Sequence, residues 1–385
     1  MNRFIGSKLR EAREARNLTA LSLADLAGVS PSAISRFEHG DIAPNLDTQS
    51  RLAQVLNLPL TFFFQKDNEQ SLAGKIFFRS LASSTKAARS KERRRLQWHV
   101  TISEYVRTFA SLPNPDIPDW EFPDNPRHLS EREIEKAAFE LRKYWALGTN
   151  PVPNMVELLE DKGIVVARYR FEDDTLDAYS AWCTDGPHIV LGADKRSAVR
   201  SRFDAAHELG HLVLHRSIDT ETLNNRDTLR RVEQDAHYFA GAFLLPEEPF
   251  ASSIMIPTLD WLLSLKWTWR VSVSAMVMRL KALDLVSPDE LRRLMKAIGS
   301  RRWSKWEPYD SDIPIEEPSL LRAALELGLT RGRVSLAGIR TLLPYATTDI
   351  EQLAGLPDGY LASGSNPRVS LKDDDHQGKI IQFPY

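Results

Sequence analysis

Apolar residues recur at helical spacing through the first 65 positions, and charged residues fill the other faces. The pattern predicts one helix over residues 6 to 16, a second that ends near Ala27, and a third over residues 31 to 38. Between the second and the third, Gly28 suits a left-handed turn and Ser30 is a preferred helix N-cap. This order of elements predicts a helix-turn-helix.

The rest of the chain alternates between helical and strand patterns. A long helix is expected over residues 83 to 111 and an amphipathic one over residues 130 to 146. Alternating apolar runs predict three short strands at residues 163–168, 177–182 and 188–191, with a further short strand at residues 75–79. Helices follow at residues 202–214 and 232–243, and again at 317–329 and 334–343. We therefore expect an α+β fold that is predominantly α-helical and contains a small β-sheet.

Length and composition narrow the class of protein. The chain has 385 residues, enough for two or three domains, and its net charge of −2 confines any affinity for nucleic acid to local surfaces. Cys183 is the only cysteine, which excludes an intrachain disulfide and a thiolate zinc cluster. The chain shows no signal-peptide pattern and no uninterrupted apolar segment of about 18 residues, so we expect a cytoplasmic protein with no membrane partner.

A dense basic block lies in the predicted helix over residues 83 to 111. One explanation is a solvated helix face; the other is a set of phosphate contacts beside the N-terminal helices. The block is opposed only by Glu92, and its cations are Lys86, Arg89, Lys91, Arg93, Arg94 and Arg95.

The segment from His207 to His211 has the sequence His-Glu-Leu-Gly-His, the HExxH pattern of zinc hydrolases. On a helix, His207 and His211 lie one above the other, so both imidazoles can reach one zinc ion. Glu208, about 100° round the helix, can face a water there as a general base. The alternative is an ordinary helix that carries two histidines by chance. His215 lies one turn further and is expected to support the site or to pack.

A catalytic zinc needs a third protein ligand. The metzincin arrangement is excluded because position 217, six residues past His211, is serine. On the helix over residues 232 to 243, Glu233 lies about 60° from the centre of the apolar stripe, whereas Asp235 lies about 100° away on the other flank. We therefore expect Glu233 to be the third ligand. The alternative is a carboxylate at the rim, paired with a cation such as Arg230.

The N-terminal segment resembles the helix-turn-helix of Xre-type, phage-repressor-like regulators. The resemblance implies binding to a double-stranded DNA operator as a homodimer, with Ser32, Ser35 and Arg36 of the third helix as the expected DNA contacts. Ala20 and Leu21 depart from the family, which often has polar groups there. The alternative is a dimerisation or docking module. The residues that carry the resemblance are Leu9-Arg10, Arg13, Leu18-Thr19, Leu23-Ala24, Ala27-Gly28-Val29-Ser30, Ile34-Ser35-Arg36 and Glu38-His39-Gly40.

The stretch from about residue 130 to 310 resembles the ImmA/IrrE-type metallopeptidases, a gluzincin-like group that cleaves helix-turn-helix repressors. Its motifs are Arg202 to Leu212 and Glu233 to Ala240, followed by Leu244-Leu245-Pro246, with weaker similarity through Trp269 to Ser272 and Trp303 to Pro308. His237 stands where the family usually has asparagine; it and Tyr238 are expected in a supporting shell of the metal, where His237 could tune the metal or steady an oxyanion.

These observations predict four segments: a helix-turn-helix domain at 1–66, a linker and basic helix at 67–129, a metallopeptidase domain at 130–309, and a C-terminal helical region with a flexible tail at 310–385. The function expected is a DNA-binding regulator with a zinc-dependent endopeptidase that cleaves a repressor-like protein or itself. The alternative is a non-proteolytic regulator or antitoxin-like protein that binds a toxin-like partner, in which the metal domain is structural or senses a ligand.

Overall fold

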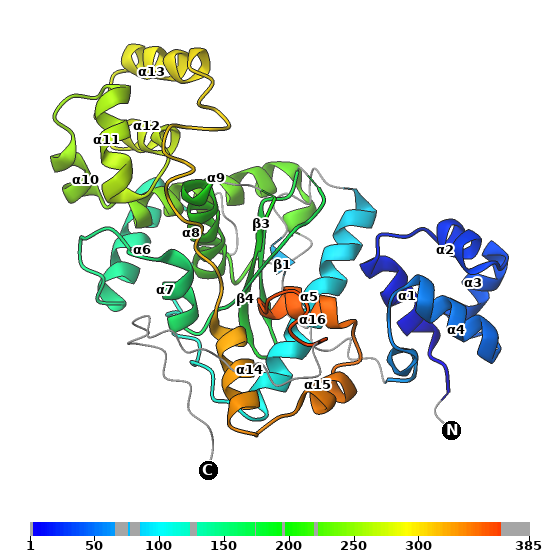
Figure 1. The fold of residues 1–385 in the computed structure, drawn as a ribbon. Helices are drawn as coiled ribbons and strands as arrows, with labels where there is room; N and C mark the ends of the chain where they lie inside the picture. Colours follow the sequence, from blue (N-terminus) through cyan, green and yellow to red (C-terminus); the bar gives the residue numbers. More distant parts are fainter. Residues whose placement is uncertain are drawn as a thin grey trace.

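The computed structural model describes residues 3–65, 76–77, 85–123, 129–173, 175–194, 197–218 and 222–362. The first of these ranges folds into a small helical bundle, which lies beside the body of the molecule (Figure 1). Gly28, after the second helix, has the predicted left-handed φ of 64°, and Ser30 caps the third helix by accepting the Ala33 amide hydrogen bond. Its elements are α1 (Gly6–Ala15), α2 (Ala20–Ala27), α3 (Pro31–His39), α4 (Leu46–Val55) and the 3-10 helix η1 (Leu60–Phe64).

A four-stranded sheet forms the centre of the body, with strand order β1-β3-β4-β2. The strands β2 and β4 are parallel, whereas β3 is antiparallel to both of its neighbours, β4 and β1. The strands predicted near residues 163–191, together with the short one near residue 76, therefore join in one sheet. Their bounds are β1 (Ile76–Phe77), β2 (Val165–Tyr169), β3 (Ala178–Cys183) and β4 (Gly186–Gly192).

The two faces of the sheet belong to different hydrophobic clusters because successive side chains of a strand point to opposite sides. Tyr179 and Val190 lie in one cluster with α5 (Lys86–Arg107). Ala178 and Ile189 lie in the other with α8 (Ala198–Leu214) and α9 (Arg226–Leu244). The same cluster continues into α6 (Glu131–Tyr144), α7 (Met155–Asp161), α10 (Glu247–Ser253), α11 (Leu259–Trp269), α12 (Val273–Ala282) and α13 (Pro288–Ser300). The short 3-10 helix η5 (Thr222–Asn224) precedes α9.

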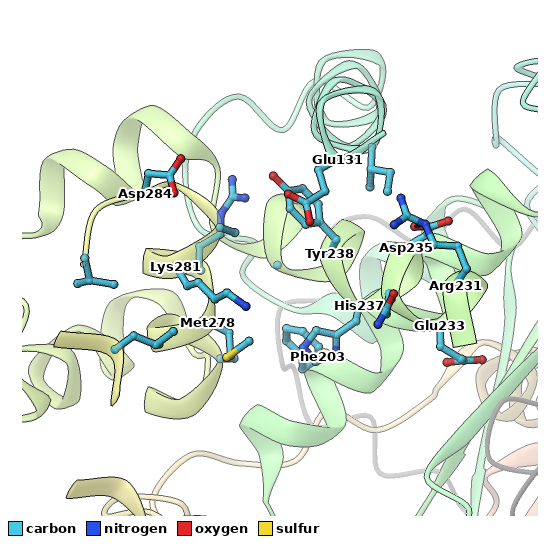
Figure 2. A pocket seen from close by; sticks show the side chains of 18 of the residues that line it. Glu131, Phe203, Arg231, Glu233, Asp235, His237, Tyr238, Met278, Lys281 and Asp284 are labelled. Atoms are coloured by element: carbon cyan, nitrogen blue, oxygen red, sulfur yellow. Dashed lines mark ion pairs between the residues drawn. The ribbon is translucent and has the colours of Figure 1, made fainter. Parts of the chain in front are cut away.

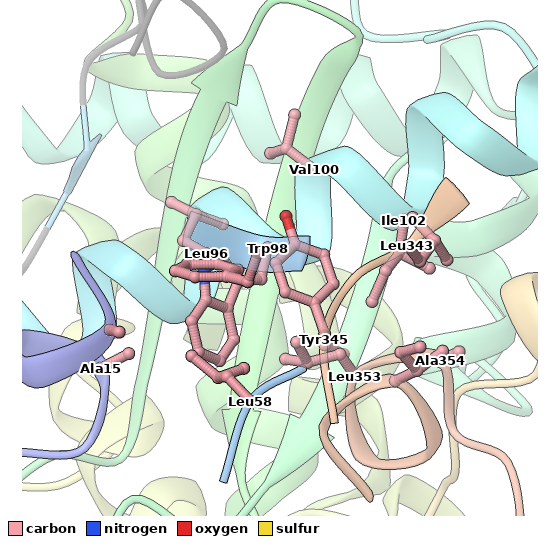
Figure 3. Packing of buried hydrophobic residues seen from close by; sticks show 14 of the residues in the cluster. Ala15, Leu58, Leu96, Trp98, Val100, Ile102, Leu343, Tyr345, Leu353 and Ala354 are labelled. Atoms are coloured by element: carbon pink, nitrogen blue, oxygen red, sulfur yellow. The ribbon is translucent and has the colours of Figure 1, made fainter. Parts of the chain in front are cut away.

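The first cluster joins three distant parts of the chain. Figure 3 shows Ala15 and Leu58 of the N-terminal bundle, Trp98 of α5, and Tyr345 and Leu353 of the C-terminal region packed side by side. The rings of Trp98 and Tyr345 stack with centroids 4.9 Å apart. The C-terminal helices are α14 (Leu320–Thr330), α15 (Leu336–Leu342) and α16 (Thr347–Ala354), the last of which the apolar pattern did not predict.

Helix α5 packs in the hydrophobic core, and half of its basic block is used in internal contacts. Lys91 is buried and donates to the Phe171 carbonyl and to Glu172, both at 3.0 Å. Arg94 pairs with Glu14 of α1 at 2.8 Å. For these cations both expectations, a solvated face and phosphate contacts, are wrong. The members of the block that are exposed are Lys86, Arg89 and Arg93.

Two expectations fall outside the described residues: the start of the linker expected from residue 67, of which residues 67–75 are not described, and the flexible tail, expected at residues 363–377. Among the helices that the structure describes, none combines the length and the apolar character needed to cross a membrane.

Candidate metal centre and DNA-binding surface

Helix α8 carries the HExxH motif on the face that packs against β3 and α9. His207 and His211 are 2% and 1% exposed, and their Nε2 atoms lie 3.0 Å apart. Gly210 lies where α8 crosses α9: a Cβ atom there would be 3.1 Å from the Phe239 ring and 3.2 Å from the Ala236 backbone. A larger residue at position 210 would force the two helices apart. The glycine thus permits the close approach that brings α9 side chains to the histidines.

Glu233 of α9 reaches both histidines, as the helical-wheel argument predicted. Its Oε2 atom lies 3.3 Å from Nε2 of His207, and its Oε1 atom lies 3.6 Å from Nε2 of His211. The side chain of Glu233 is 14% exposed, so it is the most accessible of the three. The structure therefore brings the three predicted ligand side chains together.

The donor set fits a zinc ion. Two imidazole nitrogens and one carboxylate are the ligands of the His₂Glu class of catalytic zinc sites. Zinc bonds of about 2.0–2.1 Å to a tetrahedral ion imply ligand-to-ligand separations of about 3.3 Å. The three separations between His207, His211 and Glu233 are 3.0, 3.3 and 3.6 Å. The spacing of these side chains is thus suited to one shared cation.

Glu208 lies beside the two histidines and is held from the sheet. Its ligand atom and those of His207 and His211 all lie within 4.8 Å of one another. Ser180 of β3 donates a hydrogen bond from Oγ to Oε2 of Glu208 at 2.7 Å. The sequence analysis did not single out Ser180. The signal in the sequence is a serine in the middle of a short, otherwise mostly apolar strand. The structure buries its hydroxyl, and buried hydroxyls need a hydrogen-bond partner.

A second layer of polar groups supports His211. Its Nδ1 atom lies 3.0 Å from Nδ1 of His215, whose Nε2 atom is 3.9 Å from Oδ2 of Asp235. Burial lowers the pKa of His215, and Asp235 opposes that shift. Asp235 also pairs with Arg231 at 2.9 Å. Such outer partners orient the imidazoles of metal sites, and His215 occupies this supporting position.

The angular argument was wrong about Asp235. It ranked Asp235, about 100° from the centre of the apolar stripe, as less well placed than Glu233 to face inward, but the Asp235 side chain is 2% exposed and that of Glu233 is 14% exposed. The flank is covered because α8 crosses α9 closely at Gly210 and because Arg231, one turn earlier on α9, folds over the carboxylate. A helical wheel gives the direction in which a side chain points, but it does not show which other elements cover that side chain.

His237 and Tyr238 point into different surroundings. The His237 ring lies 4.8 Å from the Phe203 ring and 6.3 Å from the His207 ring, measured between centroids. Tyr238 instead faces Arg279, whose guanidinium carbon is 6.0 Å from its ring centre. Burial, helped by the charge of Glu135, raises the pKa of Tyr238 to about 12. His237 thus borders the metal ligands, whereas the contacts of Tyr238 are with the Arg279–Glu135 ion pair.

A cavity of about 930 Å³ opens beside the metal centre between α6, α9, α12 and α13. Glu233 and His237 line one end, and Lys281 and Asp284 line the other, with Met278 on the wall between them (Figure 2). The candidate metal site therefore borders a large, partly polar cavity.

The predicted DNA contacts lie together on α3. Ser32, Ser35 and Arg36 are all exposed, on the face turned away from the bundle core. Leu21, at the position where polar groups were expected from the resemblance, is 59% exposed. Arg13 forms a partly buried ion pair with Glu38 at 2.9 Å and does not contribute a free cation to this surface. The fold and the site thus define a helix-turn-helix module joined to a metallopeptidase-type domain.

Comparison with known proteins gives the same two parts. Residues 9–63 match the helix-turn-helix family, and residues 159–281 match the peptidase M78 family, described as an IrrE N-terminal-like domain. The uncharacterized HTH-type transcriptional regulator RghRB of Bacillus subtilis (strain 168) is 30% identical over 141 residues, which cover 36% of this chain and 87% of the relative. The chain belongs to the HTH-type transcriptional regulators and carries an IrrE-like domain.

Among solved structures, the chain aligns with Bacillus thuringiensis PlcR in complex with the peptide PapR7 and DNA. The alignment covers 93% of this chain and 90% of that chain, with 14% identity and a TM-score of 0.16. A similarity of this size carries no argument about the fold.

Proposed function

We propose that this transcriptional regulator is a zinc-dependent endopeptidase that binds operator DNA through α3 and cleaves a repressor-like protein or itself. The observation that carries the peptidase part is the convergence of Glu233 with His207 and His211, next to a glutamate held by Ser180. The match to a metallopeptidase-type domain supports the same conclusion.

The roles in hydrolysis follow from these positions. His207, His211 and Glu233 would hold the zinc, which when bound supplies Lewis-acid polarisation. Glu208, oriented by Ser180, accepts a proton from the water whose oxygen bonds to the peptide carbonyl carbon. The C–N bond then breaks and the proton passes to the leaving amine. His215 keeps the His211 ring in a fixed orientation.

A cavity beside Glu233 favours catalysis over a structural metal. Structural zinc sites are closed by four protein ligands, whereas catalytic sites keep an open position. Glu233 lines the cavity of about 930 Å³, which has room for side chains of a peptide. The alternative, a structural or ligand-sensing metal domain in a non-proteolytic regulator, is favoured by the near-complete burial of His207 and His211.

The decisive experiment combines metal analysis with proteolysis. We expect about one zinc per purified chain, and none after His207 and His211 are both changed to alanine. The Glu208→Gln variant should keep zinc but lose cleavage of repressor-like proteins captured from the host. Zinc retention with undiminished cleavage in Glu208→Gln would refute the role of Glu208. Zinc retention with no cleavage by the wild-type chain would favour the structural alternative.

DNA binding by α3 supplies the regulatory part of the proposal. Ser32, Ser35 and Arg36 are exposed at the start and middle of α3, the part of a recognition helix that enters the major groove. Operators for such modules usually have two half-sites, so we propose that the regulator binds DNA as a homodimer.

A further inference from the structure

Helices α10 to α13, with the chain that follows them to residue 309, lie at the end of the molecule away from the N-terminal bundle (Figure 1). We call residues 247–309 the outer lobe. Of the 15 large apolar or aromatic side chains that are exposed among the described residues, eight belong to this lobe. Exposed apolar surface gathered in one region is typical of an interaction site. The eight are Met255, Ile256, Trp267, Met278, Leu285, Met295, Trp306 and Tyr309.

One row of apolar side chains leads out of the cavity beside the metal centre. Pro288 and Leu291 of α13 line that cavity. At about 100° per residue, Met295 points in a direction between those of Pro288 and Leu291, one helical turn beyond Leu291, and it is 42% exposed. We call these three residues the α13 stripe. Because Met278 of α12 also lines the cavity and is 38% exposed, the apolar wall of the cavity extends onto the exposed surface of the lobe.

Exposed cations border the α13 stripe. Residues 288–306 contain six arginines and lysines, all of them exposed, and two carboxylates, both in the first turn of α13. Arg292 lies about 60° round the helix from Met295, whereas Arg293 lies about 160° away. The surface around the stripe is therefore positively charged and complements an acidic ligand. The six cations are Arg292, Arg293, Lys296, Arg301, Arg302 and Lys305.

This combination of side chains selects the kind of ligand. Nucleic-acid phosphates would engage the cations but leave the methionines in water, whereas an acidic amphipathic helix of a protein engages both. Methionine side chains adapt to apolar surfaces of different shape, as peptide-binding grooves require. The part of α13 from Pro288 to Gly299 is about 17 Å long, which matches about three turns of a helix laid against it.

We infer that the α13 stripe, together with the cavity, docks an amphipathic helix with acidic flanks, carried by the protein that this regulator cleaves. The inference rests on the proposed peptidase function, because it names the substrate class and the surface that selects it. The apolar face of the helix covers Leu291 and Met295, and its carboxylates pair with Arg292 and the neighbouring cations. The segment next to the docked helix then enters the cavity that Glu233 lines.

The binding test uses the full chain with Glu208→Gln, so that no peptide is cut. The probe is a fluorescent synthetic peptide of about 14 residues, with leucines at helical spacing and glutamate or glutamine elsewhere. A second peptide has lysine in place of each glutamate. Fluorescence anisotropy gives the Kd of each peptide.

Two substitutions probe the stripe and two serve as controls. Met295→Ser removes its exposed apolar anchor, and Arg292→Glu reverses a bordering charge. The controls are Leu342→Ser, at a leucine of α15 that is 61% exposed, and Arg293→Glu, which makes the same charge change on the far side of α13. Each of the two arginines has a carboxylate three residues earlier, so the two reversals disturb the helix to a similar degree.

We expect the acidic peptide to bind with a Kd on the order of micromolar. Met295→Ser and Arg292→Glu should each weaken this binding at least about fivefold, and both controls should stay within about twofold. Hydrogen exchange of residues 288–300 should slow down when the peptide is added. Equal effects of Arg292→Glu and Arg293→Glu, equally tight binding of the lysine peptide, or no binding at about 100 µM would each overturn the inference.

Other occupants of the stripe give different results. A dimer of the free chain that dissociates in Met295→Ser would assign the stripe to a second copy of the protein. Competition with the peptide by an oligonucleotide of random sequence, lost in Arg292→Glu, would assign it to nucleic acid. Either result would overturn the inference.

The result is separable from the fate of the proposed peptidase. Binding and exchange need no catalysis, so the docking site can stand even if the wild-type chain cleaves nothing. In chains that keep Glu208, Arg292→Glu should raise the KM for a repressor-like protein and leave kcat unchanged. Cleavage that is equal in Arg292→Glu and Arg293→Glu would leave the peptidase standing and remove the docking site.

Discussion

Oγ of Ser180 lies 2.7 Å from Oε2 of Glu208 and donates a hydrogen bond to it across the space between β3 and α8. The contact joins the sheet to the helix that carries the metal ligands. It fixes the direction of a carboxylate that would otherwise rotate about its side-chain torsions. The position of the proposed general base thus depends on a strand residue 28 positions earlier in the chain.

The Ser180→Ala variant should therefore keep its zinc and lose cleavage rate. A hydrogen bond to a charged group contributes about 1.5–3 kcal/mol, so kcat should fall roughly 10- to 100-fold. The measurement is the kcat and KM of peptide cleavage, together with zinc content. Ser253→Ala is the matched control, because the Ser253 hydroxyl bonds only within its own helix turn. An unchanged kcat in Ser180→Ala would show that the serine does not position the base.

Glu233 and Asp235 should differ sharply in their effect on the metal, although both are on α9 and face α8. Glu233→Gln removes a charged ligand oxygen 3.3 Å from His207, so zinc content should fall well below one per chain. Asp235→Asn acts on the metal indirectly, through His215, so zinc should still bind, with affinity reduced about 10- to 100-fold. Competition with a chelator, followed by metal analysis, measures both. Equal loss in the two variants would contradict the assignment of Glu233 as the ligand.

Stability should fall as the pH rises towards neutrality because of Glu92. Burial raises the pKa of this carboxyl from 4.5 to about 7, against the opposing charge of Arg95 and a hydrogen bond from Tyr169. The protonated form is favoured in the folded protein. The stabilisation of the folded state by protonated Glu92 is thus fully present below about pH 4.5 and is lost as the pH rises through about 7. Its upper limit is about 3 kcal/mol.

The Glu92→Gln variant is uncharged at every pH and still offers an oxygen to the Tyr169 hydroxyl, which lies 2.8 Å from Oε2 of Glu92. It should be more stable than the wild type by about 1–3 kcal/mol at pH 8 and about equal at pH 4.5. Urea unfolding at the two pH values measures the difference. The exposed Glu248→Gln is the control, and a constant difference between the wild type and Glu92→Gln across this range would rule out the titration.

Operator binding should depend on Arg36. Loss of a base or phosphate contact by Arg36→Ala is expected to weaken binding by about 1–3 kcal/mol, which is roughly 5- to 150-fold in Kd. Arg292→Ala is a suitable control because that arginine is exposed on α13 and pairs with Asp289. Gel-shift titrations on a selected operator at fixed salt measure both. If Arg36→Ala binds like the control, α3 does not contact DNA through this side chain.

Phosphate contacts by α5 can now be tested on its exposed cations alone. A combined Arg89→Ala and Arg93→Ala change should reduce the salt dependence of operator affinity by about two units of slope if both touch phosphates. Lys91 and Arg94 are unsuitable for this purpose, because changing them breaks internal contacts. An unchanged slope would show that Arg89 and Arg93 do not contact phosphate groups.

The sequence predicts local features well where one local rule decides them. Gly28 and Ser30 mark the turn before α3, and the spacing of His207 and His211 places both on one face of α8. Glu233 was selected by its angle on the helix, combined with the chemical need for a third ligand, and the structure places it beside both histidines.

Features that depend on contacts between distant segments were missed. Nothing in the sequence shows that Lys91 would be buried against Phe171, since a run of cations normally remains in water. The pairing of Ser180 with Glu208, and of β1 with β3, depends on how the sheet meets α8. Such contacts follow from tertiary packing, which periodicity does not encode.

The docking of α1 on α5 has a consequence for any cut in the connection between them. The indole of Trp98 donates to Glu11 at 2.7 Å, and Arg16 pairs with Asp349 at 2.6 Å, within the shared apolar cluster. A single cleavage of the backbone between residues 66 and 84 would therefore give two fragments that remain associated through these contacts. The cleaved regulator would keep its DNA-binding module attached to the rest of the protein. Dissociation from an operator would then require a further step that separates the two parts.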